Sequence, residues 1–359
     1  MPVTVVVGGQ FGSEGKGKIT SYLALNDDAS IVVRCGGPNA GHTVVWNNEK
    51  RALRQVPAGF INSRTRLLLA AGAIVDPELL HREVDDLAVQ HRIGVDRSAA
   101  ILENLDADNE VRSDLLERLG STLSGTGSVT SRKVLRDPKL RLAREEPTIA
   151  SWITDVSQEA NAAIDGGELV IIEGTQGFGL SLHHGSQYPF ATSRDTSAAS
   201  FLGEAGLSPL TVTDIILVLR TFPIRVAGNS GPLEEELTWT ELRQISGYPH
   251  EIAETTTVTG RLRRVARFSF DVVERAVRVN RPTHLAIHGL DYLTYQDFGK
   301  TSFESLSKLS RAFIDSVEGR LNVPATFLFT GPANESIIDR RLQVAESAEI
   351  HCGHHRRTA

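Results

Sequence analysis

The residues best suited to chemistry form a short glycine- and lysine-rich segment near the start of the chain. It runs from Gly8 to Lys18 and follows the apolar run Val3–Val7 directly. A buried strand that leads into glycines presents backbone N–H groups to a phosphate, and glycine lets the backbone approach the ligand closely. Lys16 and Lys18 add positive charge for phosphoryl oxygens. The segment therefore predicts a phosphate-binding loop.

This segment also follows part of a known nucleotide-binding pattern. The spacing Gly12-xxxx-Gly17-Lys18 satisfies the first part of a P-loop. Ile19 stands where a P-loop places the Ser or Thr that binds magnesium. The segment is therefore either a degenerate P-loop or a different phosphate loop.

His42 is the second candidate for chemistry. It lies near the end of a glycine-containing loop, Gly36–Thr43, that follows an apolar run. Ligands of open α/β sheets bind at the carboxyl ends of the strands, where this loop would lie. His42 could act as a general acid or as an electrophile that stabilises a developing oxyanion, and a structural loop histidine is the alternative.

Two later segments offer amides and hydroxyls. In Glu173–Gly177, backbone N–H groups and the Gln176 amide could read a purine or a phosphate. The segment Tyr188–Ser193 suits phosphate contact, although a plain turn explains it equally well.

The second half of the chain adds an arginine-rich segment and an acid. Thr255–Arg264 places hydroxyls before guanidinium groups, which suits a carboxylate substrate because Arg grips carboxylates bidentately; a solvated basic surface is the alternative. Asp291 follows the apolar run Leu285–Ile287 and could accept hydrogen bonds from a base edge. Gly331 and Pro332 follow the last apolar run.

These segments need a scaffold, and recurring apolar runs predict it. Runs without polar alternation indicate strands buried on both faces, as in a parallel sheet covered by helices. The runs are Val3–Val7, Ile31–Val33, Leu67–Ala71, Leu169–Ile172, Ile215–Leu219, Leu285–Ile287 and Ala325–Phe329. Because helical segments alternate with them, we expect an α/β fold with a mostly parallel central sheet flanked by helices.

Three helices have recognisable signals. Asp76-Pro77-Glu78 reads as an N-cap, a proline at N1 and an acid in the first turn. We expect Ser151 to cap a second helix, which Gly166-Gly167 ends. Phe270, Val273 and Val277 form the apolar stripe of a third.

The composition narrows the class of protein. The 359 residues carry a net charge of −6 and have 40% hydrophobic content, which suits a large core and a small-molecule substrate rather than nucleic acid. Two cysteines exclude a disulfide framework. No signal peptide is evident, and the longest apolar run is too short to span a bilayer. We expect a soluble, cytoplasmic protein.

No linker or repeat divides the chain, so we expect one domain over residues 1–359. The charged stretch 106–147 is predicted to form mobile loops and a small helical excursion. Residues 346–359 end in a histidine-rich stretch, which favours a disordered tail over a metal site.

Taken together, the motifs resemble the adenylosuccinate synthetase family, and most closely its short archaeal-type branch. In order, they are GxEGKGK, NAGHT, EGTQG, YPxxTS, TVTGR, LD and TGP. The resemblance implies an α/β protein that forms a homodimer in the cytoplasm. It also implies that the protein is a C–N bond-forming ligase. In that family a nucleoside triphosphate phosphorylates O6 of a purine monophosphate, and L-aspartate then displaces the phosphate.

The resemblance also implies roles for individual residues. Catalytic roles fall to Ser13, Lys18, His42 and Gln176, and Mg²⁺ ligation to Ser13 and Gly41. Binding of the triphosphate falls to Gly12, Glu14, Gly15, Lys16, Gly17, Lys18, Gly41, His42, Thr43, Asp291, Gly331 and Pro332. The monophosphate and aspartate would be bound by Ser13, Asn39, Ala40, Thr122, Gln176, Thr192, Thr257, Val258, Thr259, Arg261 and Arg263, with Arg136 supplied by the partner subunit.

One departure from the family pattern bears on the substrate. Ser13 replaces the aspartate that takes the proton from purine N1 and helps to ligate magnesium. A hydroxyl is a poor base, but it leaves room beside C2 and could accept a hydrogen bond from a 2-amino group. This pattern resembles phage relatives that make N6-succino-2-amino-2′-deoxyadenylate from dGMP. The alternatives are the ordinary reaction with IMP and GTP, a damaged enzyme, and a nucleotide-binding switch.

Other departures concern the phosphoryl donor. Asp291, which reads guanine in the family, is retained, but Gly289 stands where the family has a lysine and Phe329 where bacterial members have a serine. ATP or dATP therefore becomes the expected donor, with GTP as the alternative. Leu262 also interrupts the usual arginine run.

Overall fold

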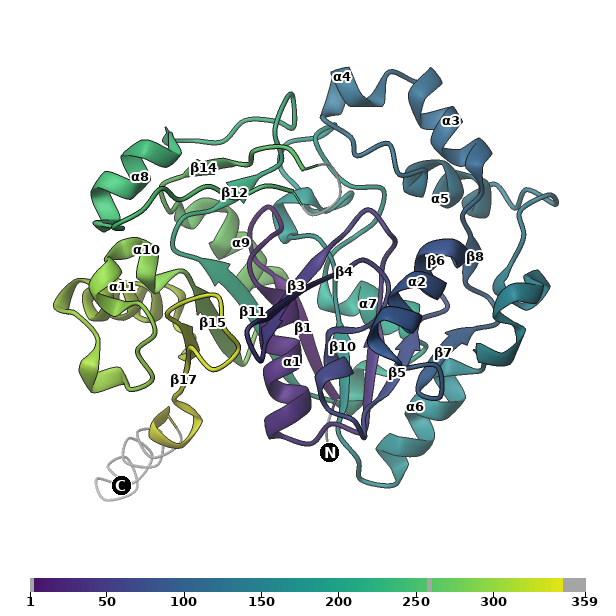
Figure 1. Cartoon of the computed structure of the whole chain (residues 1–359), viewed down its shortest axis with the longest axis horizontal. Helices are drawn as coiled ribbons and strands as arrows, with labels where there is room; N and C mark the ends of the chain where they lie inside the picture. The colour runs from purple at the N-terminus through teal and green to yellow at the C-terminus, as the bar shows by residue number, and fades with distance from the viewer. Residues whose placement is uncertain (1–2, 257–259, 345–359) are drawn as a thin grey trace, which may run out of the picture.

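The chain is built around one large sheet (Figure 1). The computed structural model describes residues 3–256 and 260–344. In spatial order the ten strands are β17 (Ile337–Asp339), β16 (Ala325–Phe329), β15 (His284–His288), β11 (Val212–Arg220), β1 (Val3–Gly8), β10 (Val170–Glu173), β2 (Ile31–Arg34), β5 (Arg66–Leu69), β7 (Ile93–Asp96) and β9 (Ile153–Thr154). Neighbouring strands are parallel except for the β16–β17 pair. The expected α/β fold with a mostly parallel sheet is confirmed.

Helices cover both faces of this sheet because both faces are apolar. On one face, Val6, Val32 and Ile171 pack with Ile19 and Leu23 of α1. The opposite face packs on α6, α7, α9 and α11 through an apolar core. The helices are α1 (Lys16–Asn26), α2 (Pro77–Leu87), α3 (Asn104–Arg112), α4 (Leu115–Leu119), α5 (Thr126–Val134), α6 (Val156–Asp165), α7 (Ala198–Ala205), α8 (Trp239–Ser246), α9 (Phe270–Asn280), α10 (Leu290–Leu293) and α11 (Lys308–Leu321).

Smaller sheets and helical groups lie above the carboxyl edge. A three-stranded sheet, β12 (Ile224–Arg225), β14 (Arg264–Ala266) and β13 (Glu236–Leu237), packs with α8, and α3, α4 and α5 form a separate group (Figure 1). The remaining strands are the hairpin β3 (His42–Trp46) and β4 (Glu49–Leu53) and the pair β6 (Ile74–Val75) and β8 (Ala100–Ile101).

Local signals explain most of the elements. The Asp76 side chain accepts a hydrogen bond from the N–H of Leu79, which confirms the predicted start of α2. The expectation for Ser151 is wrong. Ser151 lies in the 3-10 helix Pro147–Trp152, and Asp155 caps α6 by accepting from the N–H of Gln158. Because Asp155 lies immediately before the helix, it can reach the N3 amide, whereas Ser151 lies a full turn too early.

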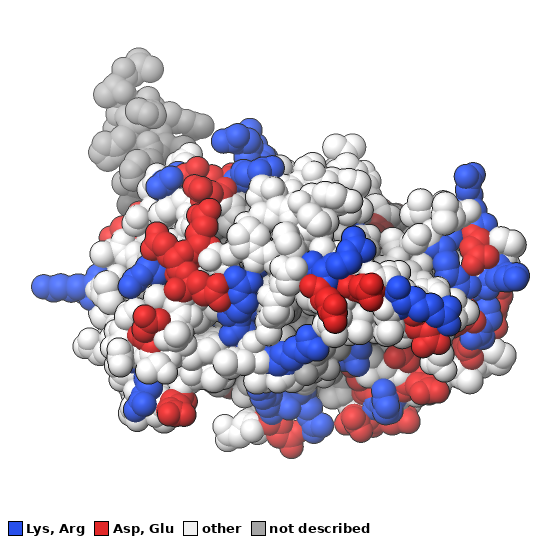
Figure 2. All heavy atoms as spheres, turned by 90° about the horizontal axis from the view of Figure 1, so that it is seen from above, with Lys and Arg blue, Asp and Glu red and all other residues white. Residues whose placement is uncertain are grey.

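Two further features concern the helices and the surface charge. None of the helices in the described residues has the length and apolar composition needed to cross a membrane. On the face seen in Figure 2, basic and acidic side chains are interspersed, so that face carries no continuous basic stripe. The expected tail, residues 346–359, lies outside the described residues.

Candidate active site

In the middle of the central sheet, the four strands around β1 end in an ionisable residue at the same edge. β2 ends at Arg34, β10 at Glu173, β11 at Arg220 and β15 at His288. The chain leaves β1 for strands on one side of it and later returns to strands on the other side. Ligands of doubly wound sheets bind at the carboxyl edge of such a reversal. The expected phosphate loop follows β1 at this point.

The backbone of the phosphate loop is fixed by a buried carboxylate. Glu14 is fully buried and accepts hydrogen bonds from the N–H of Gln10 at 3.1 Å and of Gly12 at 2.8 Å. Lys16 donates to its other oxygen at 2.6 Å. Gly12 and Ser13 adopt the left-handed conformation, with φ of 88° and 59°. Glu14 and Lys16 therefore shape the loop from inside.

Lys18 lies at the start of α1 and is almost completely buried. Its Nζ donates to the carbonyl of Gly331 at 2.7 Å and to that of Ser336 at 3.0 Å. It also lies 4.7 Å from the centre of the Phe329 ring. Burial lowers the pKa of Lys18 to about 7, against the attraction of Asp291. A bound phosphate would restore the charged form, since an opposite charge nearby favours it.

His42 belongs to a buried triad with Glu173 and Arg34. Nδ1 of His42 contacts Oε1 of Glu173, to which Arg34 Nη1 also donates at 3.1 Å. Burial, and then the positive charge of Arg34, lower the pKa of His42 to about 4. The imidazole is therefore neutral near pH 7. Since the Glu173 carboxylate accepts the Nδ1 proton, Nε2 is the nitrogen left to meet a substrate.

The loop after β10 lies directly against the phosphate loop. The N–H of Gly179 donates to the carbonyl of Gln10 at 2.7 Å. A methyl group on Gly177 would lie 2.2 Å from Oε1 of Glu14, so only glycine fits there. Gln176 has a φ of 61° and is half-buried. The structure thus brings Gln176 and Ser13 to neighbouring loops, and His42 joins them because Gly17 lies against its Cβ.

A second charged cluster meets the phosphate loop from the side of β11. Arg220 donates to the carbonyl of Ser13 at 3.1 Å and forms a double ion pair with Glu254. Arg263 also donates to Glu254, at 3.2 Å, as does the Tyr292 hydroxyl at 3.0 Å. Although burial opposes it, Arg220 and then Arg263 lower the pKa of Glu254 to about 2. Arg263, expected to grip aspartate, is thus linked to Ser13 through Glu254 and Arg220.

Thr122 and Arg136 lie on the helical excursion. The Thr122 hydroxyl donates to that of Ser124 at 3.1 Å, and Thr126 lies against Gly37 at the start of the His42 loop. Arg136 occupies an exposed turn after α5, with a φ of 56°. Among the described residues, its guanidinium has no hydrogen bond or ion pair. This protomer therefore brings Thr122 toward the site but leaves Arg136 at the surface.

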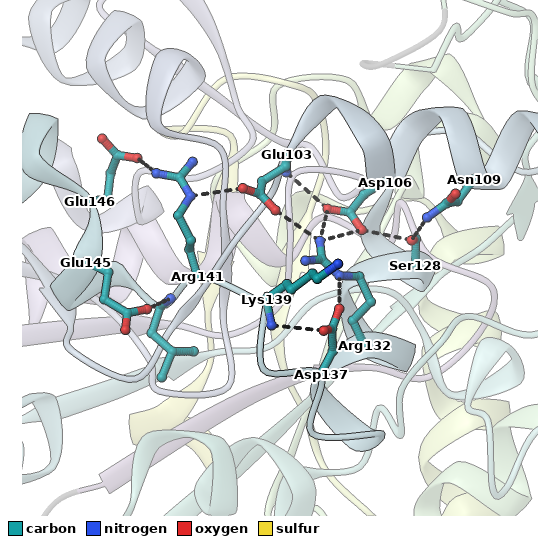
Figure 3. Close-up of polar contacts among 11 residues, drawn as sticks. Glu103, Asp106, Asn109, Ser128, Arg132, Asp137, Lys139, Arg141, Glu145 and Glu146 are labelled. Atoms are coloured by element: carbon teal, nitrogen blue, oxygen red, sulfur yellow. Dashed lines mark hydrogen bonds and ion pairs between the residues drawn. The ribbon is translucent and has the colours of Figure 1, made fainter.

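An ion-pair network joins the start of α3 to the end of α5 (Figure 3). Arg132 on α5 contacts three carboxylates at 2.9–3.1 Å, those of Glu103, Asp106 and Asp137. Arg141 adds ion pairs with Glu103 at 2.9 Å and with Glu146 at 2.8 Å (Figure 3). This network fixes the turn that carries Arg136, since Arg132 and Asp137 flank it.

The other residues expected at the site differ in how far they are buried. Ala40 is buried and its carbonyl accepts from Arg34 at 2.8 Å, while Asn39, Gly41 and Thr43 are half-buried beside it. Thr192 is half-buried and donates its N–H to the carbonyl of Leu180 at 2.7 Å. Asp291 is buried and Pro332 is exposed. Arg261 is exposed, and its carbonyl accepts from the N–H of Thr256 at 2.8 Å. Thr257, Val258 and Thr259 lie outside the described residues.

The donor set argues against a preformed metal centre. Within residues 3–256 and 260–344, no group of three or more His, Cys, Asp or Glu side chains is arranged to hold a metal ion. Ser13 offers a hydroxyl without a hydrogen-bond partner among the described residues, and Gly41 offers a carbonyl. This set fits Mg²⁺ that is bound mainly through substrate phosphates, because Mg²⁺ commonly uses few protein ligands there.

Sequence reasoning assigned no role to the side chains at these four strand ends, although Glu173 opens a segment that it singled out. Arg34 and Glu173 orient His42, and Arg220 anchors Ser13. His288 lies 5.4 Å from the Phe329 ring, and its buried Nδ1 has no partner among the described residues. A common signal marks all four: each is a charged or ionisable residue that ends or follows an apolar run.

A glycine–lysine loop between β1 and α1, at the carboxyl edge of a parallel sheet, defines an α/β protein that binds nucleotide phosphates. The model of the adenylosuccinate synthetase family matches residues 5–144 and 139–298. The chain belongs to this family and is an adenylosuccinate synthetase-type C–N ligase.

Relatives agree on the family, and a solved structure agrees on the fold. The adenylosuccinate synthetase of Pyrococcus horikoshii is 41% identical over 346 residues, which cover 95% of this chain and 99% of the relative. That of Methanocaldococcus jannaschii is 40% identical over 343 residues, or 94% and 96% of the two chains. The fully ligated Plasmodium falciparum enzyme has the same fold, with a TM-score of 0.84 at 21% identity over 95% of this chain and 100% of its own.

A viral enzyme is also similar. The succinoaminodeoxyadenylate synthetase of cyanophage S-2L, solved with dGMP and with dATP as an energy donor, is 28% identical with a TM-score of 0.80. The match covers 94% of this chain and 95% of that enzyme.

Proposed function

We propose that this ligase joins L-aspartate to C6 of dGMP, with ATP or dATP as phosphoryl donor. The product is N6-succino-2-amino-2′-deoxyadenylate, a precursor of 2-aminoadenine in viral DNA. In the first step the γ-phosphoryl group moves to O6 and leaves the nucleoside diphosphate behind, while N1 gives its proton to bound water or to a substrate phosphate. In the second step the amino nitrogen of aspartate attacks C6, and phosphate leaves.

Ser13 carries this proposal. Its backbone is held in the left-handed conformation, its carbonyl is anchored by Arg220, and its hydroxyl has no partner among the described residues. An uncharged, small side chain at this position leaves space for a 2-amino group and can accept its hydrogen bond. The likeness to the cyanophage enzyme solved with dGMP supports the same substrate.

Other residues would act around this position. His42, positioned by Glu173, would meet O6 through Nε2, and bound phosphates would favour its protonated, donating form. Lys18 and the loop N–H groups would hold phosphates, with Thr122, Gln176 and Thr192 at the monophosphate. Arg261 and Arg263 would bind the aspartate carboxylates. Mg²⁺, held by phosphate oxygens with Ser13 and Gly41, would neutralise charge on the transferred group.

We also propose that the enzyme is a homodimer in which Arg136 enters the partner's site. Arg136 follows Val134 and Leu135, which are each 73% exposed, and large apolar side chains exposed together indicate an interface. Mixed dimers of Arg136→Ala and His42→Ala should regain part of the activity, because one of the two sites would be intact. No recovery in fully exchanged mixtures would contradict a role in trans.

Ordinary adenylosuccinate synthesis from IMP and GTP is the second candidate. It is favoured by the curated relatives at 41% identity, which are adenylosuccinate synthetases.

A product assay separates the two candidates. The enzyme is incubated with L-aspartate, Mg²⁺ and a mixture of ATP, dATP and GTP, with IMP, GMP or dGMP supplied separately, and products are identified by mass spectrometry. Succinylated dGMP supports the proposal. A product from IMP alone contradicts it.

A further inference from the structure

Tyr248 and Asp291 form a buried pair on the side of the site near Lys18. The Tyr248 hydroxyl donates to Oδ2 of Asp291, a side chain that is only 4% exposed. The other oxygen, Oδ1, is buried and has no hydrogen-bond partner in the described part of the chain. Buried acceptors are nearly always paired, so Oδ1 marks a position for a donor on a ligand.

The position of Asp291 indicates which ligand reaches it. Asp291 lies on α10, directly after β15 at the carboxyl edge of the sheet. It is close enough to Lys18 for the two charges to influence each other's pKa. A nucleotide whose phosphates meet Lys18 would therefore direct its base toward Asp291.

Tyr248 is held firmly in place. It is 7% exposed and belongs to the apolar cluster of the small sheet, with Trp239 and Leu242. The ring of Tyr295 lies 4.7 Å away and that of Phe298 6.3 Å away, centre to centre. Packing on this scale keeps the hydroxyl on Oδ2, and the aromatic rings nearby offer a surface for stacking a base.

We propose that Tyr248 determines which base the phosphoryl donor carries. Guanine presents two adjacent N–H donors, at N1 and N2, that suit both oxygens of a carboxylate. Adenine presents one amino group beside an acceptor nitrogen. Because Tyr248 occupies Oδ2, Asp291 has one free acceptor, and the site takes adenine. This inference rests on the proposed function, since it assigns the donor nucleotide of the same reaction.

The test is Tyr248→Phe, which keeps the ring and frees Oδ2. Binding of ATP, dATP and GTP is measured by calorimetry with Mg²⁺ and without monophosphate or aspartate. In the wild type, ATP and dATP should bind more tightly than GTP, and the variant should shift the ratio toward GTP by about tenfold. Tyr22→Phe is the matched control, because the Tyr22 hydroxyl donates to Asp339 at 3.2 Å on β17. Its ratio should match the wild type.

A second variant covers the case in which Tyr248→Phe does not fold. Asp291→Ala removes both acceptors and should bring the affinities for ATP and GTP within about threefold of each other. Two results overturn this inference: a wild type that prefers GTP, or a variant that folds and still prefers adenine nucleotides. Neither result contradicts the proposed ligase function. If the wild type binds none of the three nucleotides, the proposed function fails together with it.

Discussion

Two clusters of charged side chains differ in what their surroundings do to them. At the carboxyl edge of the sheet, burial lowers the pKa of Lys18 to about 7 and that of His42 to about 4, away from the charged forms. On the excursion, burial is outweighed by ion pairs, which lower the pKa of Glu103 and raise that of Arg132, toward the charged forms (Figure 3).

This difference indicates that the cluster at the sheet edge binds ligands and that the cluster on the excursion stabilises the fold. Lys18 and His42 are deprived of solvent, and an incoming phosphate would return their charge, so ligand binding and protonation are coupled. Arg132 is already paired with carboxylates, so a ligand would not change its charge. We therefore expect the first cluster to control activity and the second to control stability.

The largest expected effect is that of His42→Asn. Removal of a group that transfers a proton or stabilises the oxyanion should lower kcat by about 10²- to 10⁴-fold. The melting temperature should change little, because asparagine can still donate to Glu173. A variant that retains wild-type kcat would remove His42 from the chemistry.

Lys18 should make donor binding depend on pH. The triphosphate binds the charged form of Lys18, and the pKa of Lys18 in the free enzyme is about 7. Affinity is therefore full below pH 7 and should weaken above it, by up to about tenfold per pH unit. Calorimetry between pH 6 and 9 measures this. Lys18→Arg, which stays charged, should flatten the profile, and an equally steep profile in that variant would exclude Lys18 as its source.

The smallest effect on catalysis is expected for Arg132→Ala. Its loss leaves Asp106, which is fully buried, without its cation, and should lower the free energy of unfolding by about 1.5–3 kcal/mol in urea titrations. Donor affinity should be unchanged. Arg141→Ala is the control, because Arg141 is 43% exposed and its ion pairs should contribute less than about 1 kcal/mol. Equal losses in the two variants would contradict the role given to burial.

Much of the fold could be predicted because the signals were local. Each apolar run became a strand of the central sheet, and Asp76 caps α2 as expected. The start of α6 was misjudged because Ser151 and Asp155 are both good caps, and packing decides between them. The strand Ile93–Asp96 was missed because Gly94 interrupts a short run.

The site was less predictable, because its key contacts join distant parts of the chain. The glycine loop can be recognised from a few consecutive residues. By contrast, Arg34 and Glu173 are 139 positions apart in the sequence, and Arg220 and Ser13 are 207 apart. Only the order of strands in the sheet brings these pairs together.

The central claim is that Ser13 selects a 2-amino purine, and Ser13→Asp tests it most directly. The ratio of kcat/KM for dGMP to that for IMP is measured in the wild type, in Ser13→Asp and in Ser13→Ala, which removes the hydroxyl without adding charge. We predict that Ser13→Asp impairs the use of dGMP by about tenfold or more, equivalent to ~1.4 kcal/mol, and that Ser13→Ala has a smaller effect. Unchanged turnover of dGMP in Ser13→Asp would contradict the account.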